Sequence, residues 1–308
     1  MPADYTTPRF DVKVERNVVY TTASGYWTEA PAGVAPPLGL ILRCGSPKQL
    51  EVDMDIYLPE GDASSGRPLL LMMHGGSFYL GNKNEKGQSE WCRYFASLGY
   101  VAASINYRLG FHLNRNDFRN AELRALEDAD AALDYLLSAR KDLRIDPERV
   151  FAAGTSSGAI TAMALAYRPG ADHRICAVAN LWGAVHDLSV LERADVPIIS
   201  FQSVQDPVVP YVEGYPMAKF SLFTRGISGY MYGTRSIHEK ALALGIRSEH
   251  HPYPEARHRL HMDKSGQLTP RFYEVRDAMA AFFYGYDGEI TFRNTATLSP
   301  VKVQAVVE

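Results

Sequence analysis

The sequence predicts an α/β fold with a mostly parallel central sheet flanked by helices on both faces. Short, continuous apolar runs, which are typical of strands covered on both sides, alternate with segments whose apolar residues recur at helical spacing. Strands and helices in alternation need crossover connections, and these produce parallel strands. The chain has 308 residues, 46% of them hydrophobic, so we expect a single domain over residues 1–308.

The elements are expected in a simple order. Residues 1–47 combine short extended pieces with Pro/Gly-rich stretches and predict edge strands and loops. Residues 48–286 form the core, and residues 287–308 form a C-terminal extension with strand-like alternation. Strands are predicted at 52–58, 68–73, 100–105, 149–153, 177–182, 196–201 and 248–253. Helices are predicted at 91–98, 117–137, 159–167, 237–244 and 270–284, the last with Thr269 as its N-cap.

Charge and composition exclude several classes of partner. The net charge is -3, and no run of Lys or Arg resembles a surface for nucleic acid or anionic membrane. No stretch reaches the roughly 18 apolar residues of a membrane-spanning helix. Residues 1–9 lack the basic and apolar regions of a signal peptide, so we expect a soluble chain, either cytoplasmic or trimmed from a secreted precursor.

The three cysteines, Cys44, Cys92 and Cys176, are odd in number and far apart. This spacing is typical neither of a disulfide framework nor of a metal-binding motif. We expect packed thiols, with a Cys44–Cys92 disulfide as the open alternative.

The main chemical signal is the pentapeptide Gly154-Thr155-Ser156-Ser157-Gly158. It lies between an apolar run and an alanine-rich run, which is the strand–turn–helix context of a nucleophile elbow. Small neighbours let the strand and helix approach each other, so Gly154 and Gly158 have a steric role. Ser156 is then the expected nucleophile, and the backbone N–H of Ser157 an expected oxyanion donor. The alternative is an ordinary Gly-Ser turn.

A second signal, His74-Gly75-Gly76-Ser77, directly follows the apolar run 68–73. A backbone with few side chains exposes N–H groups to a substrate carbonyl, so we expect Gly76 and Ser77 to donate to an oxyanion, with His74 and Gly75 shaping the loop. The alternative interpretation is a turn that ends a strand.

An acid and a base complete the expected set. Asp206 and His258 each follow the carboxyl end of a predicted strand, and these ends form the functional edge of a parallel sheet. The order Ser156, Asp206, His258 is the one expected for an elbow of this kind. Asp187 and Asp195 are rival acids at less suitable positions, because Asp187 follows the preceding strand and Asp195 comes before its own strand.

His261 lies three residues after His258 and is the alternative base. A metal site is a different interpretation of the histidines, but no Cys, Asp or Glu completes a ligand spacing there, so we predict no metal and no cofactor. The histidines in question are His250, His251, His258 and His261.

Aromatic residues beside the same edge are candidate pocket residues, with core packing as the alternative for each. They are Phe78, Tyr79 and Trp182, together with Tyr107.

The combined motifs resemble bacterial serine carboxylesterases of the α/β-hydrolase superfamily, including acetyl- and feruloyl-esterase-like members. The resemblance covers about residues 48–286 and rests on five segments: 73–81, 105–109, 145–150, 154–158 and 206–210. It implies an α/β-hydrolase fold with a small cap or none, a catalytic set of Ser156, Asp206 and His258, and no cofactor. The first histidine of segment 255–261 looks like the catalytic one.

The chain departs from the family pattern at three places. Ser77 replaces the third glycine of the donor loop, and Ser157 stands where alanine is frequent. Gln202-Ser203 stands where relatives often have His-Gly before the acid.

The expected function is therefore hydrolysis of short-chain or aryl carboxylic esters through an acyl-enzyme, on a small-molecule or polymer-attached substrate. A peptidase, thioesterase or lactonase would use the same residues, whereas a non-catalytic adhesion module would have a broken triad. Only segments 184–195 and 211–233 are placed to cover the site, so we expect it to be accessible. Their aromatic residues, which would form one wall and favour aryl or plant-cell-wall esters, are Tyr211, Phe220, Phe223, Tyr230 and Tyr232.

Overall fold

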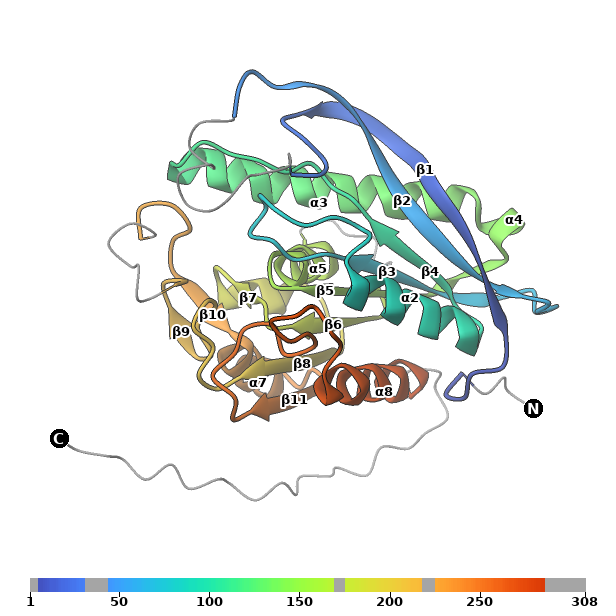
Figure 1. Cartoon of the computed structure of the whole chain (residues 1–308). Coiled ribbons are helices and arrows are strands. Elements are labelled where there is room, and N and C mark those ends of the chain that lie inside the picture. The colour runs from blue at the N-terminus through green and yellow to red at the C-terminus, as the bar shows by residue number, and fades with distance from the viewer. Residues whose placement is uncertain (1–4, 31–43, 169–174, 218–224, 286–308) are drawn as a thin grey trace.

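The structure, a computed structural model, describes residues 5–30, 44–168, 175–217 and 225–285. The C-terminal extension at 287–308 lies outside these residues. An eight-stranded sheet with the order β1-β2-β4-β3-β5-β6-β8-β11 forms the centre (Figure 1). Its strands are β1 (Asp11–Gly25), β2 (Lys48–Glu60), β3 (Arg67–Met73), β4 (Val101–Ile105), β5 (Ile145–Thr155), β6 (Ala177–Leu181), β8 (Ile198–Ser203) and β11 (Ser248–Tyr253).

The six strands from β4 to β11 in this order run parallel, and β1 and β2 add an antiparallel edge. Every residue of β3 and β4 is buried, which explains their continuous apolar sequences. The prediction of a mostly parallel sheet is confirmed. Within the described residues 5–30, the N-terminal edge is one strand of 15 residues rather than several short pieces, because it pairs with β2 along its length.

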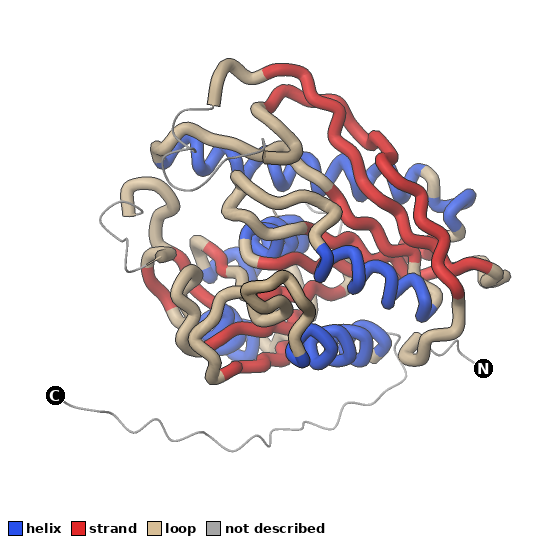
Figure 2. The backbone as a smooth tube through the Cα atoms, in the orientation of Figure 1, coloured by secondary structure: helices blue, strands red, loops and turns tan. Residues whose placement is uncertain are grey.

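Helices cover both faces of the sheet, as predicted. Helices α2 (Lys86–Leu98) and α8 (Pro270–Tyr284) pack on one face, while α3 (Arg115–Ser138), α5 (Ser157–Tyr167) and α7 (Thr234–Ala243) pack on the other (Figure 1). Each face has its own apolar core. The short α4 (Arg140–Leu143) follows α3, and the 3₁₀ helix η1 (Leu188–Arg193) precedes β8. The longer loops gather at one end of the sheet (Figure 2).

A second, three-stranded antiparallel sheet has the order β7-β10-β9. Its strands β7 (Ala184–Val185), β9 (Glu213–Gly214) and β10 (Met231–Gly233) come from the two segments expected near the site. Phe220 and Phe223 lie outside the described residues. Tyr230 packs edge-on against Tyr232, whereas Tyr211 stacks on His250 with ring centroids 5.6 Å apart.

Two details differ from the sequence-based expectations. The Thr269 side chain donates to the carbonyl of Leu260 and makes no capping hydrogen bond to α8, so it ties the preceding loop instead. The cysteines are free thiols, and the Cys44–Cys92 alternative is wrong. The Cys44 Sγ donates to the carbonyl of Phe111, and Cys92 is buried in the core.

Candidate active site

Ser156 occupies a sharp turn between β5 and α5. Its φ of 53° and ψ of -118° lie in a region that residues other than glycine rarely adopt. The turn depends on close backbone contacts, because a Cβ on Gly158 would lie 2.2 Å from the carbonyl oxygen of Met73. A Cβ on Gly154 would lie 2.3 Å from the backbone of Gly158. Only glycines fit both positions, as the elbow motif predicts.

His258 lies within hydrogen-bonding distance of both Ser156 and Asp206. The His258 Nε2 lies 2.8 Å from the Ser156 Oγ, and its Nδ1 lies 2.8 Å from the Asp206 Oδ2. The Asp206 side chain is fully buried, and its Oδ1 accepts from the N–H groups of Val208 (2.8 Å) and Val209 (3.1 Å). A carboxylate held in this way makes Nδ1 of His258 the donor and leaves Nε2 to accept a proton from Ser156.

His261, the alternative base, lies in a different environment. Its ring is 1% exposed and sits between Trp91 and Trp182, with centroid distances of 5.1 Å to each. Burial lowers its pKa, and its Nε2 lies 3.6 Å from a carboxylate oxygen of Glu85. A Cβ on Gly87 would come within 2.3 Å of the ring, so the packing is close. The structure brings His258, and not His261, to Ser156.

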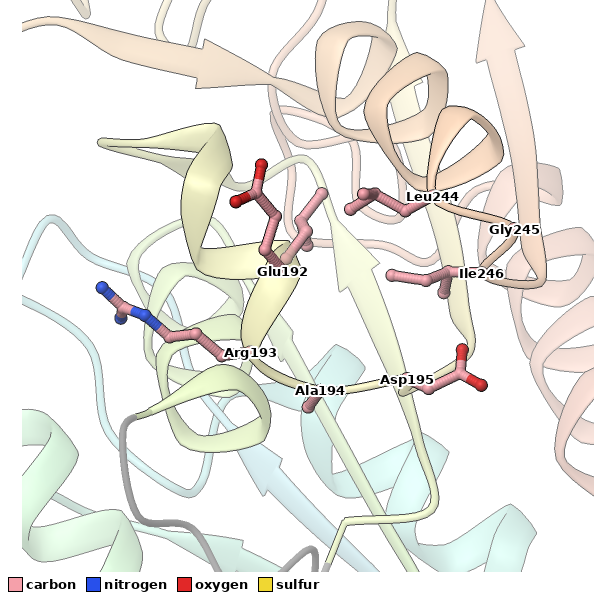
Figure 3. A pocket seen from close by; sticks show the side chains of 8 residues that line it. Glu192, Arg193, Ala194, Asp195, Leu244, Gly245 and Ile246 are labelled. Atoms are coloured by element: carbon pink, nitrogen blue, oxygen red, sulfur yellow. The ribbon is translucent and has the colours of Figure 1, made fainter.

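The two rival acids also lie elsewhere. Asp187 caps η1, where its Oδ1 accepts from the N–H of Ser189 at 2.9 Å. Asp195 lines a surface pocket of about 400 Å³, formed by residues 191–195 and 244–246 (Figure 3). These residues precede β8 and β11, so the pocket lies at the amino ends of the strands, opposite the edge that carries Ser156.

The loop after β3 lies against the elbow, since a Cβ on Gly75 would be 3.2 Å from the Ser156 Cβ. The His74 ring stacks on Tyr107 with centroids 4.3 Å apart, and the Tyr107 hydroxyl donates to the His74 carbonyl at 2.7 Å. Burial lowers the pKa of His74 to about 4, so this ring is neutral and its Nδ1 donates to the Gly75 carbonyl. These contacts hold the loop in place beside the elbow.

The expected oxyanion donors lie in the turn after β3 and at the start of α5. The N–H groups of Tyr79 and Leu80 both donate to the Gly76 carbonyl, which makes a tight turn at this point. Ser77 is exposed, with a φ of 56°, so the turn is open to solvent. Ser157 is the first residue of α5, where helical N–H groups have no intrahelical partner.

The three candidate pocket residues lie in the core instead. Phe78, Tyr79 and Trp182 are 1%, 2% and 1% exposed. Phe78 packs edge-on against Phe118, and Tyr79 packs against Trp27 at 4.8 Å between centroids. Their bulky rings are excluded from water by neighbouring aromatics, so we assign them a packing role and not a place on an open pocket wall.

The histidines do not converge on one point. His250 contacts Thr234 and His251 stacks on Phe201, whereas His258 contacts Asp206 and His261 stacks on Trp182. Within the described parts of the chain, no three His, Cys, Asp or Glu side chains are grouped so that they could hold a metal ion.

Sequence reasoning missed a buried charge cluster behind the donor loop. Lys83, 2% exposed, places its Nζ 2.8 Å from Asp55 and 3.4 Å from Asp53. The alternating pattern of β2 predicts that its polar residues face water, but the Lys83 side chain covers them. The N–H of Lys83 also donates to Asn106 at 2.8 Å, which ties the loop to the end of β4. A lysine that follows a glycine-rich loop gives no local sign of this role.

Comparisons with known proteins agree with this architecture. A family model described as BD-FAE matches residues 54–175. Among curated proteins, gut esterase 1 of Caenorhabditis elegans is 29% identical over 105 residues, which is 33% of this chain and 18% of the esterase. The non-reducing polyketide synthase ausA of Emericella nidulans is 35% identical over 121 residues, 38% of this chain. The chain spans only a small part of these relatives, 5% of the synthase.

Solved structures match over more of the chain. Thermogutta terrifontis esterase 2 phosphorylated by paraoxon is 19% identical, covers 79% of this chain and 92% of its own, and has a TM-score of 0.57. The butyrate-bound form covers 93% and 97%, with 18% identity and a TM-score of 0.55. A putative dienelactone hydrolase from Klebsiella pneumoniae, 12% identical, covers 89% and 98% with a TM-score of 0.55. The chain thus has the α/β-hydrolase fold. None of its described helices has the length and apolar character to cross a membrane.

Proposed function

We propose that this chain is a serine carboxylesterase that hydrolyses its substrate through an acyl-enzyme. The observation that carries the proposal is the pair of 2.8 Å contacts that link Ser156, His258 and Asp206. The strained backbone of Ser156 and the adjacent loop of glycines support it, because an elbow and a donor loop are the two other parts that ester hydrolysis requires. We take residues 48–286 as the catalytic unit.

In the first half-reaction, the Ser156 Oγ attacks the ester carbonyl carbon while His258 Nε2 takes the hydroxyl proton. The backbone N–H groups of Gly76, Ser77 and Ser157 stabilise the negative charge that develops on the carbonyl oxygen. Asp206 stabilises the imidazolium and keeps Nδ1 as the donor. His258 then gives the proton to the leaving alcohol, and the acyl group stays on Ser156.

In the second half-reaction, water attacks the acyl-enzyme and His258 accepts the proton of that water. The same donors stabilise the second oxyanion, and the acid is released as Ser156 recovers its proton. One base serves both steps, so the position of His258 controls both rates.

Short-chain esters are the proposed substrates. The chain resembles an esterase that was solved with butyrate bound, and its donor-loop residue Ser77 is exposed. The buried packing of Phe78, Tyr79 and Trp182 leaves the aromatic residues of segment 211–233 as the remaining argument for an aryl pocket. Aryl esters therefore remain substrates to test and are not the preferred class.

The test compares Ser156→Ala with its neighbour Ser157→Ala in the hydrolysis of p-nitrophenyl acetate and butyrate. Ser156→Ala should lose several orders of magnitude in kcat, whereas Ser157→Ala keeps its backbone N–H and should remain active. Paraoxon should phosphorylate the wild type on Ser156, which mass spectrometry would detect. Near-normal hydrolysis by Ser156→Ala would overturn the proposal.

A lactonase is the second candidate, since a putative dienelactone hydrolase has a similar fold. A panel of short-chain esters, lactones, thioesters and amides separates these activities. The ester proposal predicts the highest kcat/KM on esters, and a higher value on a lactone would favour the second candidate.

A further inference from the structure

Gln202 lies directly behind the proposed catalytic acid, at one of the positions where the sequence departs from the family pattern. It is fully buried near the end of β8, and its Nε2 lies 3.3 Å from the Asp206 Oδ2. The same oxygen accepts from the His258 Nδ1 at 2.8 Å. A change at Gln202 therefore acts on the carboxylate oxygen that orients the base.

The orientation of the Gln202 amide follows from the chemistry of its neighbours. Its Nε2 faces acceptors only, since besides Asp206 it lies 3.0 Å from the carbonyl of Val209 and 3.4 Å from that of Pro210. Its Oε1 faces the backbone N–H of Thr234 at 3.2 Å and the Thr234 hydroxyl at 2.7 Å. A backbone N–H can only donate and a carbonyl can only accept, so the amide cannot be turned around.

Thr234 extends this network away from the site. Its hydroxyl donates to Gln202, so it must accept from the His250 Nε2, which lies 3.2 Å away. Burial lowers the pKa of His250 to about 3, so this ring is neutral, with its proton on Nε2. A Cβ on Gly233 would lie 1.8 Å from the Pro210 carbonyl oxygen, so glycine allows the start of α7 to come this close.

We propose that Gln202, held by Thr234, is a positioning residue that fixes the Asp206 carboxylate and limits the charge it presents to His258. The inference rests on the proposed roles of Ser156, His258 and Asp206. Hydrogen bonds run in one direction from His250 through Thr234 and Gln202 to Asp206. The His250 Nε2 donates to the Thr234 hydroxyl, and this hydroxyl donates to the Gln202 Oε1. The Gln202 amide is thereby held so that its Nε2 donates to Asp206. Gln202 does not contact the substrate.

The sign of the electrostatic effect follows from the geometry. A donor on Asp206 Oδ2 disperses negative charge that would otherwise stabilise the imidazolium of His258. Without this donor, the protonated base is favoured and the acid limb of the kcat/KM profile moves to higher pH. The charged and titratable groups around the network and the base lie on α2, α7, β11 and the adjoining loops: Glu85, Tyr211, Arg235, His238, His250, His251, Arg257, Arg259 and His261.

The experiment compares two variants that lack a side-chain hydrogen bond of the network with two that keep it. Gln202→Met keeps an unbranched side chain of similar length without a donor, and Thr234→Val keeps the branched shape without the hydroxyl. Gln202→Met should lower kcat on p-nitrophenyl butyrate about tenfold with little change in KM. Thr234→Val should lower kcat by less, because its backbone N–H still donates to Gln202 Oε1. Gln202→Met should move the acid limb of kcat/KM up by about half a pH unit, and Thr234→Val should move it in the same direction by less.

Thr234→Ser keeps the hydroxyl and should restore the wild-type profile. Ser203→Ala is the matched control, because Ser203 is the neighbour of Gln202 but its hydroxyl accepts from Gln205 rather than contacting Asp206. If Gln202→Met does not fold, the comparison of Thr234→Val with Thr234→Ser decides the question alone.

The outcomes separate this inference from the proposed function. An inactive Ser156→Ala together with a wild-type kcat and acid limb in Gln202→Met, or in Thr234→Val if Gln202→Met does not fold, would overturn the role of Gln202 and leave the esterase proposal standing. Reduced activity with an unmoved acid limb, or failure of Thr234→Ser to restore it, would mean a purely structural role and would also overturn the inference. An active Ser156→Ala would overturn the proposed function itself.

Discussion

The Asp206→Asn substitution tests the proposed site most directly. Four donors converge on this carboxylate: the N–H groups of Val208 and Val209 on Oδ1, and His258 Nδ1 and Gln202 Nε2 on Oδ2. An asparagine has one oxygen and one NH₂ group. Whichever way its amide is turned, the NH₂ group faces donors.

Each orientation of the asparagine amide disrupts a different contact. An NH₂ group at the Oδ1 position would face two backbone N–H groups, which cannot become acceptors. At the Oδ2 position it faces His258, whose ring can accept only by moving its proton to Nε2. That tautomer cannot take a proton from Ser156. We expect kcat to fall by about 10⁴, equivalent to about 5 kcal/mol of transition-state stabilisation.

The assay is steady-state hydrolysis of p-nitrophenyl butyrate, with thermal unfolding measured in parallel to show that the variant is folded. Asp187→Asn is the control, because Asp187 caps η1 away from Ser156, and its kcat should match the wild type. A folded Asp206→Asn enzyme that loses less than tenfold in kcat would refute the reasoning.

Three further predictions concern the surroundings of the site. Gly158→Ala should destabilise the protein by about 1–3 kcal/mol or more and reduce kcat at least 100-fold in any folded fraction. The reason is that the added Cβ would lie 2.2 Å from Met73 and displace the elbow. Urea unfolding and steady-state kinetics measure the two effects, and an unchanged stability together with an unchanged kcat would contradict the prediction. His74 has a folded-state pKa of about 4 against an ordinary 6.5, so the unfolded chain binds more protons between these values and stability falls as the pH falls. The wild type should lose about 3 kcal/mol more than His74→Asn between pH 7 and 4, and parallel stability curves for the two proteins would argue against the assignment. Lys83→Met should lower the free energy of unfolding by about 3 kcal/mol, because it leaves the buried Asp55 carboxylate without its lysine. Calorimetry measures the effect, and an unshifted Tm would mean that Arg16 alone suffices to pair with that carboxylate.

The proximity of Ser156, Asp206 and His258 could be predicted because each follows the carboxyl end of an apolar run. In a parallel sheet such positions share one edge, so local patterns are enough to place residues that lie 52 and 102 positions apart along the chain. The fold class could be predicted for the same reason, since buried parallel strands have continuous apolar sequences.

The choice between His258 and His261 could not be made from local sequence. The two are three residues apart in an irregular loop, and the difference arises where Trp91 and Trp182, from distant segments, enclose the second ring. The core positions of Phe78 and Tyr79 likewise depend on distant aromatics such as Trp27. Contacts between distant segments produce no periodic pattern in the local sequence.

The enclosure of His261 has an optical consequence. Only three tryptophans occur in the sequence, and two of them, Trp91 and Trp182, flank this ring three residues from His258. Indole emission responds to its immediate surroundings, so the intrinsic fluorescence of the unlabelled protein should report on the loop that carries the proposed base. Acylation of Ser156 could then be followed by stopped-flow fluorescence with natural, colourless esters that release no chromophore.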